Sequence, residues 1–298
     1  MKNYEKKVAR CYSTWGKSYY GDYYSKRSPY PPVHLALIRN IIKKHRPKNL
    51  IDAGCGPASM LRNLAGLSAG LYGFDLTPEM VEEAKQVFLK MNLNPDRIWQ
   101  GSVLDRHAFG GGHKKSRYDA LLSWGVMPHL KEKDEKRVIL NFKSALRPDG
   151  IACVEARNEL FALFTMNRHS KDLFWDRLMA GEKLLQSARH QRKNLMKAAH
   201  EFWSHFRMDL PPIRRGKKAE PGYDEVLSRL HNPFELRQKF LACGFHEADV
   251  KFYHFHAMPP MMGASVPKLF LKESLKIENP DDWRGYFMAS AFVIVAKV

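Results

Sequence analysis

The sequence predicts an α/β protein in which helices cover both faces of a mainly parallel, doubly wound sheet. Short apolar runs alternate with longer amphipathic segments from residue 33 to residue 156, the pattern of repeated strand–helix–strand units. Strands are expected at 48–53, 71–74, 98–100, 120–123 and 151–156. A chain of 298 residues, 44% of them hydrophobic, is long enough to bury one such core and to carry insertions.

The helices between these strands have recognisable ends. Thr77 is a good N-cap, and a proline follows it at the first position of a helix expected over 78–91. The other core helices are expected over 33–44, 58–67, 131–146 and 235–243. Gly244 ends the last of them, and strands at 249–256 and 287–298 complete the sheet.

Two long stretches interrupt the alternation. Residues 159–231 carry apolar side chains at helical spacing, so we expect one or two helices lying over the ligand-binding edge of the sheet. Between 181 and 220 this insertion has ten Lys or Arg and four acids. A second excursion spans 257–286. The predicted organisation is an aromatic cap at 1–30, a core at 31–158 and 232–298, and a basic helical lid at 159–231.

Composition limits the classes of function. The net charge is +18, with 49 basic and 31 acidic residues, so a negative partner is expected: nucleic acid, an acidic carrier, a phosphorylated metabolite or a membrane surface. Solubility alone is the simpler alternative. No apolar run reaches the roughly 20 residues of a membrane span, and the N-terminus lacks the apolar stretch of a signal peptide. The four cysteines form no Cys-x-x-Cys pair, and we expect a reduced, cytoplasmic protein.

The most informative motif joins the first two strands. Asp52, Gly54 and Gly56 lie in a glycine-rich turn after the first strand, and Asp75 lies at the tip of the second. Glycines permit a tight turn and a close backbone approach to a ligand, and the Asp75 carboxylate can accept both hydroxyls of a ribose. Ala58 stands where a dinucleotide loop has its third glycine. The Asp52 charge would repel a pyrophosphate but suits an ammonium group.

This pattern resembles the first two motifs of class I S-adenosylmethionine-dependent methyltransferases. Residues 100–105, 118–126 and 145–150 resemble the adenine-lining segment, the fourth strand and the turn before strand five of that family. The resemblance covers about 34–158 and, more weakly, 233–298. It implies a Rossmann-like sheet of seven strands with the last strand antiparallel. It also implies an N-terminal cap over the cofactor, and eight aromatic residues crowd into residues 4–30.

Ligands of open α/β sheets bind at the carboxyl ends of the strands, and with the resemblance this selects a cofactor site. The expected S-adenosylmethionine ligands are Asp52, Gly54, Cys55 and Gly56 at the methionine end, Asp75 at the ribose, Leu76, Met80, Ser102 and Val103 around the adenine, and Ser123 and Trp124 near the sulfonium. Ser102 stands where the family often has an acid for the adenine amine.

The acceptor site is less sharply defined. Its expected residues are Glu155, Arg157 and Asn158 at the end of strand five, Arg284, and Tyr19 and Tyr23 of the cap. For Arg284 the alternative is an ion pair with a local acid. The candidate general bases are His129, His254 and His256, with ordinary structural roles as the alternative. His254 and His256 share one strand face, but no third ligand signals a metal, so none is expected.

Three functions compete. The first is methylation of an oxygen or nitrogen of a small molecule, anionic or carrier-bound, such as a secondary metabolite or a glycan precursor; a lid that excludes water favours it. The second is RNA methylation, with the basic insertion holding phosphates. Against it, no appended RNA-binding module is recognisable, and Ser123-Trp124-Gly125 replaces the tetrapeptide that holds a flipped base. The third is cofactor binding without catalysis. The oligomeric state stays open.

Overall fold

The computed structural model describes residues 2–25, 28, 30–111, 117–210 and 221–298. Residues 211–220, which hold four of the basic side chains counted in the insertion, lie outside the described residues.

Seven strands form one sheet in the order β3-β2-β1-β4-β5-β7-β6. The strands are β1 (Asn49–Ala53), β2 (Gly70–Asp75), β3 (Ile98–Gln100), β4 (Tyr118–Ser123), β5 (Leu146–Arg157), β6 (Glu247–Phe255) and β7 (Ala289–Lys297). The first five pair in parallel, and β7 runs antiparallel to both β5 and β6. The doubly wound sheet with an antiparallel last strand is therefore confirmed. The strand order reverses between β1 and β4, which places a ligand crevice at their carboxyl ends.

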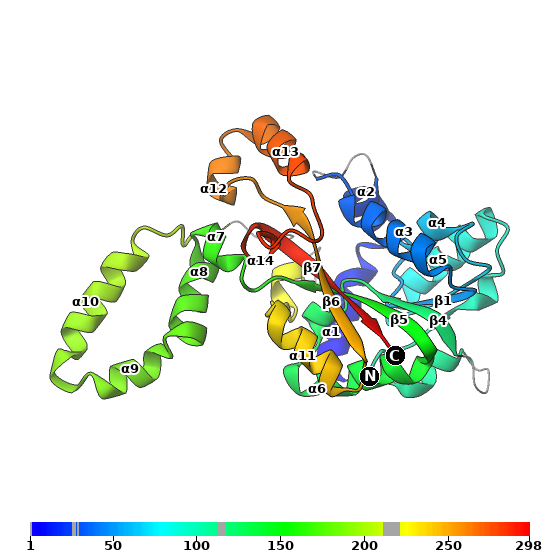
Figure 1. The fold of residues 1–298 in the computed structure, drawn as a ribbon, viewed down its shortest axis with the longest axis horizontal. Coiled ribbons are helices and arrows are strands. Elements are labelled where there is room, and N and C mark those ends of the chain that lie inside the picture. Colours follow the sequence, from blue (N-terminus) through cyan, green and yellow to red (C-terminus); the bar gives the residue numbers. More distant parts are fainter. Residues whose placement is uncertain (1, 26–27, 29, 112–116, 211–220) are drawn as a thin grey trace.

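Helices cover both faces of the sheet (Figure 1). The core helices are α3 (Val33–His45), α4 (Leu61–Leu64), α5 (Pro78–Lys90), α6 (Glu132–Ala145) and α11 (Pro233–Ala242). Ile38, Leu61 and Phe88 pack on one face together with Cys153 of β5. The next residue of that strand, Val154, joins the opposite cluster, as alternation along a strand requires.

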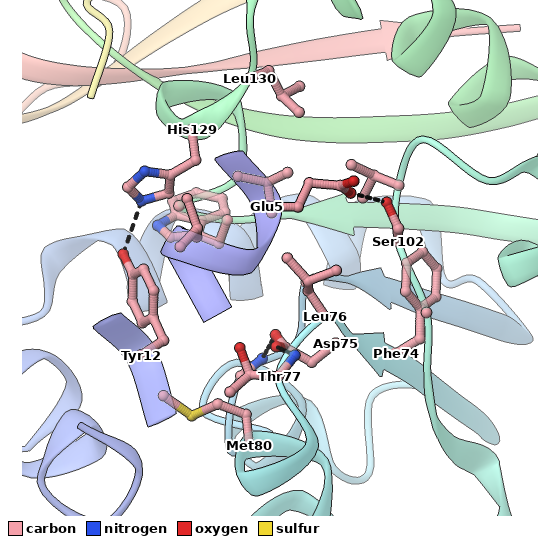
Figure 2. Close-up of a pocket in the computed structure, with 18 of the residues that line it drawn as sticks. Glu5, Tyr12, Phe74, Asp75, Leu76, Thr77, Met80, Ser102, His129 and Leu130 are labelled. Carbon is pink, nitrogen blue, oxygen red and sulfur yellow. Dashed lines mark hydrogen bonds between the residues drawn. The ribbon is translucent and has the colours of Figure 1, made fainter. Parts of the chain in front are cut away.

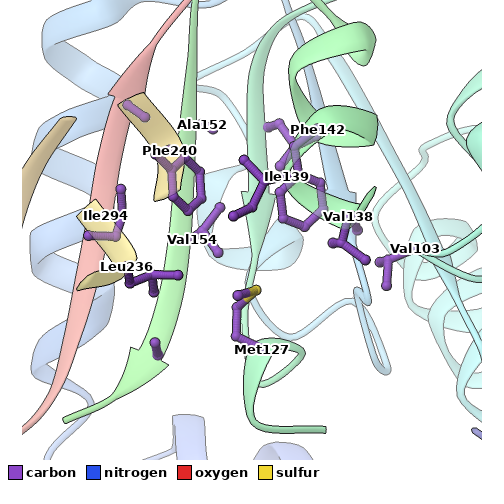
Figure 3. Close-up of a cluster of buried hydrophobic side chains, with 14 of the residues drawn as sticks. Val103, Met127, Val138, Ile139, Phe142, Ala152, Val154, Leu236, Phe240 and Ile294 are labelled. Carbon is purple, nitrogen blue, oxygen red and sulfur yellow. The ribbon is translucent and has the colours of Figure 1, made fainter. Parts of the chain in front are cut away.

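Figure 3 shows that opposite cluster. Ile139 and Phe142 of α6 and Phe240 of α11 lie against Val154 of β5 and Ile294 of β7. All five side chains are completely buried. This packing joins the parallel half of the sheet to the antiparallel end, so the carboxyl ends of β4 and β5 are held in a fixed relation.

Two element boundaries differ from the sequence prediction. The helix expected at 58–67 is only α4, because Ala58 and Gly66 both have positive φ angles, of 55° and 81°. The last strand was expected from 287, but the short helix α14 (Gly285–Met288) precedes it. Short 3-10 turns form the remaining connections, at η1 (Pro95–Arg97), η2 (Arg106–Gly110), η3 (Met127–His129), η5 (Arg189–Gln191) and η6 (Tyr223–Glu225).

The insertion after β5 is helical, but its distal half does not cover the sheet. It comprises α7 (Ala162–Thr165), α8 (Arg168–Asp172), the π-helix η4 (Leu173–Leu178), α9 (Gly181–Ser187) and α10 (Arg192–Trp203). In Figure 1, α9 and α10 extend away from the body of the molecule. The expectation of helices over the ligand-binding edge was therefore wrong for α9 and α10.

The physical reason is that aromatic side chains of the insertion, from η4 and α10, pack on one another. The ring centroids of Phe174 and Phe202 lie 5.8 Å apart, and those of Trp175 and Trp203 lie 6.3 Å apart. Phe174 and Phe202 lie in helices, as their spacing predicted. Their side chains pack on each other within the insertion and not on the sheet. Leu178 keeps 60% of its surface exposed.

Two further helical segments lie near the carboxyl ends of the strands. The N-terminal segment forms α1 (Asn3–Ser13) and α2 (Gly16–Tyr24). The excursion after β6 forms α12 (Pro260–Gly263) and α13 (Pro267–Lys276). Among the described helices, none has both the length and the apolar character needed to cross a bilayer.

Candidate functional site

The turn after β1 is fastened to the end of β2 by its backbone. The amides of Gly54 and Cys55 both donate to the Phe74 carbonyl, at 2.8 and 3.0 Å, and the Gly56 amide donates to Asp75 Oδ2 at 2.8 Å. Gly54 and Gly56 have φ angles of +88° and +51°, which favour glycine. The two halves of the predicted motif therefore meet, as the sequence indicated.

Asp75 is oriented by two backbone donors. Besides the Gly56 bond, its Oδ1 accepts the Thr77 amide at 2.9 Å. Burial raises the pKa of Asp75, opposed by these hydrogen bonds. The Thr77 hydroxyl and the Leu76 amide add further hydrogen bonds to this carboxyl, whose two oxygens together offer about four lone-pair sites. Asp75 lines a cavity of about 110 Å³, so it can present those sites to a vicinal diol.

The side chains around this first cavity are shown in Figure 2. Its described lining includes the apolar residues Val8, Phe74, Leu76, Met80, Val103 and Leu130. Glu5 and Asp75 are its ionisable carboxylates, and no lysine or arginine is among its described lining residues. An acidic cavity of this kind repels a pyrophosphate and suits a ligand with cationic sulfur and nitrogen. The donor and acceptor set therefore fits S-adenosylmethionine better than a dinucleotide.

Glu5 was not anticipated from the sequence. It lies on α1, is only 6% exposed, and its Oε1 accepts the Ser102 hydroxyl at 2.5 Å. Ser102 stands where an acid was expected for the adenine amine, and Glu5 brings a carboxylate to the same place from the N-terminal helix. The available signal was helical spacing, since Glu5, Val8 and Tyr12 share one face of α1.

The α1 helix is tied to the core beside this cavity. Lys2 Nζ lies 2.5 Å from Asp134 Oδ1, and the Tyr4 hydroxyl donates to Asp134 Oδ2 at 2.9 Å. The Tyr12 hydroxyl lies 2.9 Å from His129 Nε2. These contacts hold the helix against α6 and the end of β4, so a ligand in the first cavity lies beneath it.

Three predicted cofactor ligands do not line the cavity with their side chains. Asp52 is 1% exposed, and its Oδ1 has no hydrogen-bond partner among the residues that the structure describes. Burial first, and then the charge of Asp75, raise the pKa of Asp52 to about 8. Cys55 is buried behind the turn, and the Ser123 hydroxyl donates to the Ala53 carbonyl at 3.0 Å. This corrects the prediction that Asp52 holds the methionine end. Strand alternation turns the side chains of Asp52 and Ser123 inward, and for Ser123 only the backbone was expected to approach the sulfonium.

A second, larger cavity of about 610 Å³ adjoins the first. Both cavities are lined by Tyr12, Tyr19, Trp124 and Gly125. Many of the other lining residues are aromatic, among them Trp15, Tyr23, Tyr24, Tyr30, His34, Phe161, Tyr223 and Tyr253. Such a space accepts a mainly apolar or planar molecule, with the shared residues marking where it would meet a ligand in the first cavity.

The end of β5 brings two charged residues to the second cavity. Glu155 and Arg157 alternate along the strand and so share one face. Glu155 is 6% exposed, and its Oε2 accepts the Gly125 amide at 2.8 Å. The Arg157 guanidinium lies 4.8 Å from the Tyr223 ring centre and donates to the Ser228 hydroxyl at 3.1 Å. Both lie where an acceptor-binding residue was expected.

Of the other predicted acceptor residues, some line the second cavity and one does not. Tyr19 and Tyr23 line the second cavity. Asn158 does too, but its amide nitrogen already donates to the carbonyls of Gly285, Tyr286 and Ala289, so it fixes backbone rather than offering a free donor. Arg284 does not reach either cavity. Its guanidinium binds Asp282 two residues earlier, at 2.6 to 3.1 Å, so the alternative of a local ion pair holds and the acceptor contact does not.

His129 lines the first cavity but both of its ring nitrogens are engaged. Nδ1 lies 2.6 Å from the Leu227 carbonyl and must carry the proton, which leaves Nε2 to accept from Tyr12. Burial lowers the pKa of His129 to about 4. A histidine held in this way fixes α1 and the segment at Leu227, so its predicted role as general base is corrected.

The two histidines near the end of β6 lie close together, as predicted, with ring centroids 5.2 Å apart. His254 lines the second cavity and lies 4.0 Å from the Tyr30 ring, whereas His256 packs between Phe161 and Phe270 outside the cavity lining. Burial lowers their pKa values to about 4 and about 3. Across the part of the chain that is described, no group of three or more His, Cys, Asp or Glu is arranged to hold a metal ion.

Known proteins resemble the chain in sequence and in fold. Residues 50–150 match the family described as "Methyltransferase domain". The ubiquinone biosynthesis O-methyltransferase of Haemophilus ducreyi is 28% identical over 155 residues, which are 52% of this chain and 57% of that protein. The chain thus spans a little over half the length of this curated relative.

Solved structures with a similar arrangement include a SAM-dependent methyltransferase from Archaeoglobus fulgidus. It is 12% identical, with a TM-score of 0.47, and the match covers 89% of this chain and 93% of that one. A putative O-methyltransferase from Nostoc punctiforme is 14% identical, with a TM-score of 0.49, covering 96% of this chain and 60% of that one.

Proposed function

We propose that the chain is a class I S-adenosylmethionine-dependent methyltransferase that methylates an oxygen or nitrogen of a small molecule bound in the second cavity. When bound, S-adenosylmethionine supplies a methyl group already activated on its sulfonium. The protein's own residues then have to hold both molecules in line and exclude water. A cytoplasmic setting fits this proposal, because all four cysteines are buried as thiols.

The observation that carries the proposal is the shared wall between the two cavities. In the first, we assign Asp75 to the ribose, Glu5 to the adenine amine and the turn at Gly56 to the methionine end, because all three line this cavity or its edge. Trp124 and Gly125 also line the second cavity, so an acceptor there lies next to the position of the sulfonium. The Trp124 ring adds a face on which a cationic sulfur is favourable.

Arg157 supports an anionic or carrier-bound acceptor. It is a lining residue of the second cavity and also of a third, more polar cavity of about 590 Å³. A carboxylate or phosphate at the junction of these two spaces would meet the guanidinium, while an aromatic or other apolar part lies among the tyrosines. Secondary metabolites and glycan precursors of this kind remain the proposed substrates.

The test is a transfer assay with deuterated-methyl cofactor and acceptors from four classes: phenols, aryl carboxylic acids, primary amines and sugar phosphates. We expect a mass increase in at least one class, and Arg157→Met should raise KM for its anionic members about tenfold or more while sparing neutral ones. Absence of transfer to all classes, with S-adenosylhomocysteine still bound, would count against a small acceptor.

RNA methylation is the second candidate, supported by the helix α10, which carries Arg192, Lys193 and Lys197 and stands clear of the body (Figure 1). It predicts RNA binding whose affinity falls steeply with salt, since each released counterion contributes to the slope. Replacing Arg192, Lys193 and Lys197 by Gln should flatten that slope. Weak, salt-insensitive RNA binding would dismiss this candidate.

A further inference from the structure

Glu155 is the one buried carboxylate among the described residues that line the second cavity. The other carboxylate in that lining, Asp22, is exposed and accepts the Trp15 indole N–H at 2.9 Å. Glu155 accepts the amide of Gly125, a residue shared with the first cavity. This bond places the carboxylate at the junction where a methyl group has to pass from one cavity to the other.

The Glu155 carboxylate retains acceptor capacity toward the cavity. Oε2 receives one strong hydrogen bond, at 2.8 Å, while Oε1 receives only a long one from the Tyr253 hydroxyl, at 3.4 Å. An ionised carboxyl offers about four lone-pair sites, so an acceptor O–H or N–H can still donate to it. By contrast, the acceptor capacity of His129 is already used by Tyr12.

We propose that Glu155 takes the proton of the acceptor during methyl transfer, an inference that rests on the proposed function. As the acceptor oxygen or nitrogen forms its bond to the methyl carbon, the carbon–sulfur bond breaks and its electron pair stays on sulfur. The acceptor's O–H or N–H bond gives its electrons to the oxygen or nitrogen, and the proton passes to Glu155. The products are the methylated acceptor, S-adenosylhomocysteine and protonated Glu155.

Burial distinguishes this carboxylate from the nearby histidines. A histidine base becomes cationic when it takes a proton, and burial lowers the pKa values of His34 and His254 to about 3 and about 4. A carboxylate becomes neutral when it takes a proton, and burial raises the pKa of Glu155. The same apolar surroundings therefore weaken the histidines as bases and strengthen Glu155.

The groups that face Glu155 limit how far this effect goes. They are Arg157 on the same strand, His231 ahead of α11, and the hydroxyls of Tyr19, Tyr24, Tyr223 and Tyr253. Arg157 and His231 favour the ionised form, as do the hydrogen bonds from Gly125 and Tyr253. Glu155 is therefore expected to be ionised in the resting enzyme and neutral after the reaction.

The first experiment does not depend on knowing the acceptor. Infrared difference spectra of the full chain with bound S-adenosylhomocysteine are recorded across pH for the wild type and Glu155→Gln, so that the carboxyl band lost in the variant identifies Glu155. The proposal expects a pKa above the usual 4.5. A Glu155 that stays protonated at neutral pH overturns it, because a protonated carboxyl cannot take the proton of the acceptor.

The second experiment uses whichever of the four acceptor classes is methylated. Glu155→Gln can still accept the Gly125 amide but cannot take a proton, so kcat should fall about 100-fold or more, with the affinity for S-adenosylhomocysteine within about threefold. The acid limb of the kcat pH profile should also disappear. A control outside both cavity linings, Glu273→Gln, should leave kcat and the affinity for S-adenosylhomocysteine unchanged. Retention of kcat within about fivefold, or of the acid limb, refutes Glu155 as the base. If the wild-type protein does not bind S-adenosylhomocysteine at all, the proposed function itself is refuted.

Discussion

Replacing Asp75 by Ala tests the geometry of the cofactor site directly. The carboxylate accepts the amides of Gly56 and Thr77 and lines the first cavity. Two charge-assisted hydrogen bonds to a ribose are together worth about 3 kcal/mol, which is a loss of about 100-fold or more in affinity for S-adenosylhomocysteine. Calorimetric titration of the variant measures this loss.

The same substitution has a separate effect on stability. It leaves two backbone N–H groups without their acceptor, at a cost of about 2 kcal/mol in the free energy of unfolding, or about 5 °C in Tm. Thermal unfolding followed by circular dichroism separates this effect from binding. Glu79→Gln, an exposed carboxylate in the first turn of α5, is the control. A dissociation constant within threefold of the wild type, in a folded variant, would refute the assignment of Asp75 to the ribose.

Three other outcomes are expected. Glu5→Gln should weaken S-adenosylhomocysteine binding about tenfold. It should also reduce the protection from hydrogen exchange that the bound ligand gives to α1. Equal protection in both proteins would contradict a contact between α1 and the ligand. His129→Phe should lower Tm while keeping kcat within about fivefold, because both ring nitrogens already have partners. A 100-fold loss of kcat in a fully folded variant would show that His129 acts as the base. Burial raises the pKa of Glu135, but hydrogen bonds from His231 and Lys239 outweigh it and lower the pKa to about 2, from an ordinary 4.5. Because the pKa of Glu135 is lower in the folded state than in the unfolded state, this group contributes about 3 kcal/mol to the free energy of unfolding. The contribution is complete above pH 4.5 and is lost as the pH falls toward 2. Urea unfolding of Glu135→Gln should therefore lack that part of the acid dependence.

The sheet illustrates what the sequence determined. The Gly54–Gly56 turn and Asp75 are separated by one strand–helix–strand unit, and parallel pairing of β1 with β2 necessarily brings their carboxyl ends together. The same reasoning placed Glu155 and Arg157 at the edge of the crevice, since both end a predicted strand. Local spacing was sufficient here because strand alternation and crossover geometry leave few other arrangements.

The direction in which long segments pack was decided only by tertiary structure. The aromatic residues of the insertion at 159–231 have helical spacing, yet spacing does not say whether the apolar face meets the sheet or another helix; in α10 it meets η4. Likewise, nothing near Ser102 in the sequence announced that Glu5, 97 residues earlier, would face it. Helical and strand periodicities are local properties, whereas the partner of a face depends on contacts between residues distant in the chain, and those form only when the whole fold assembles.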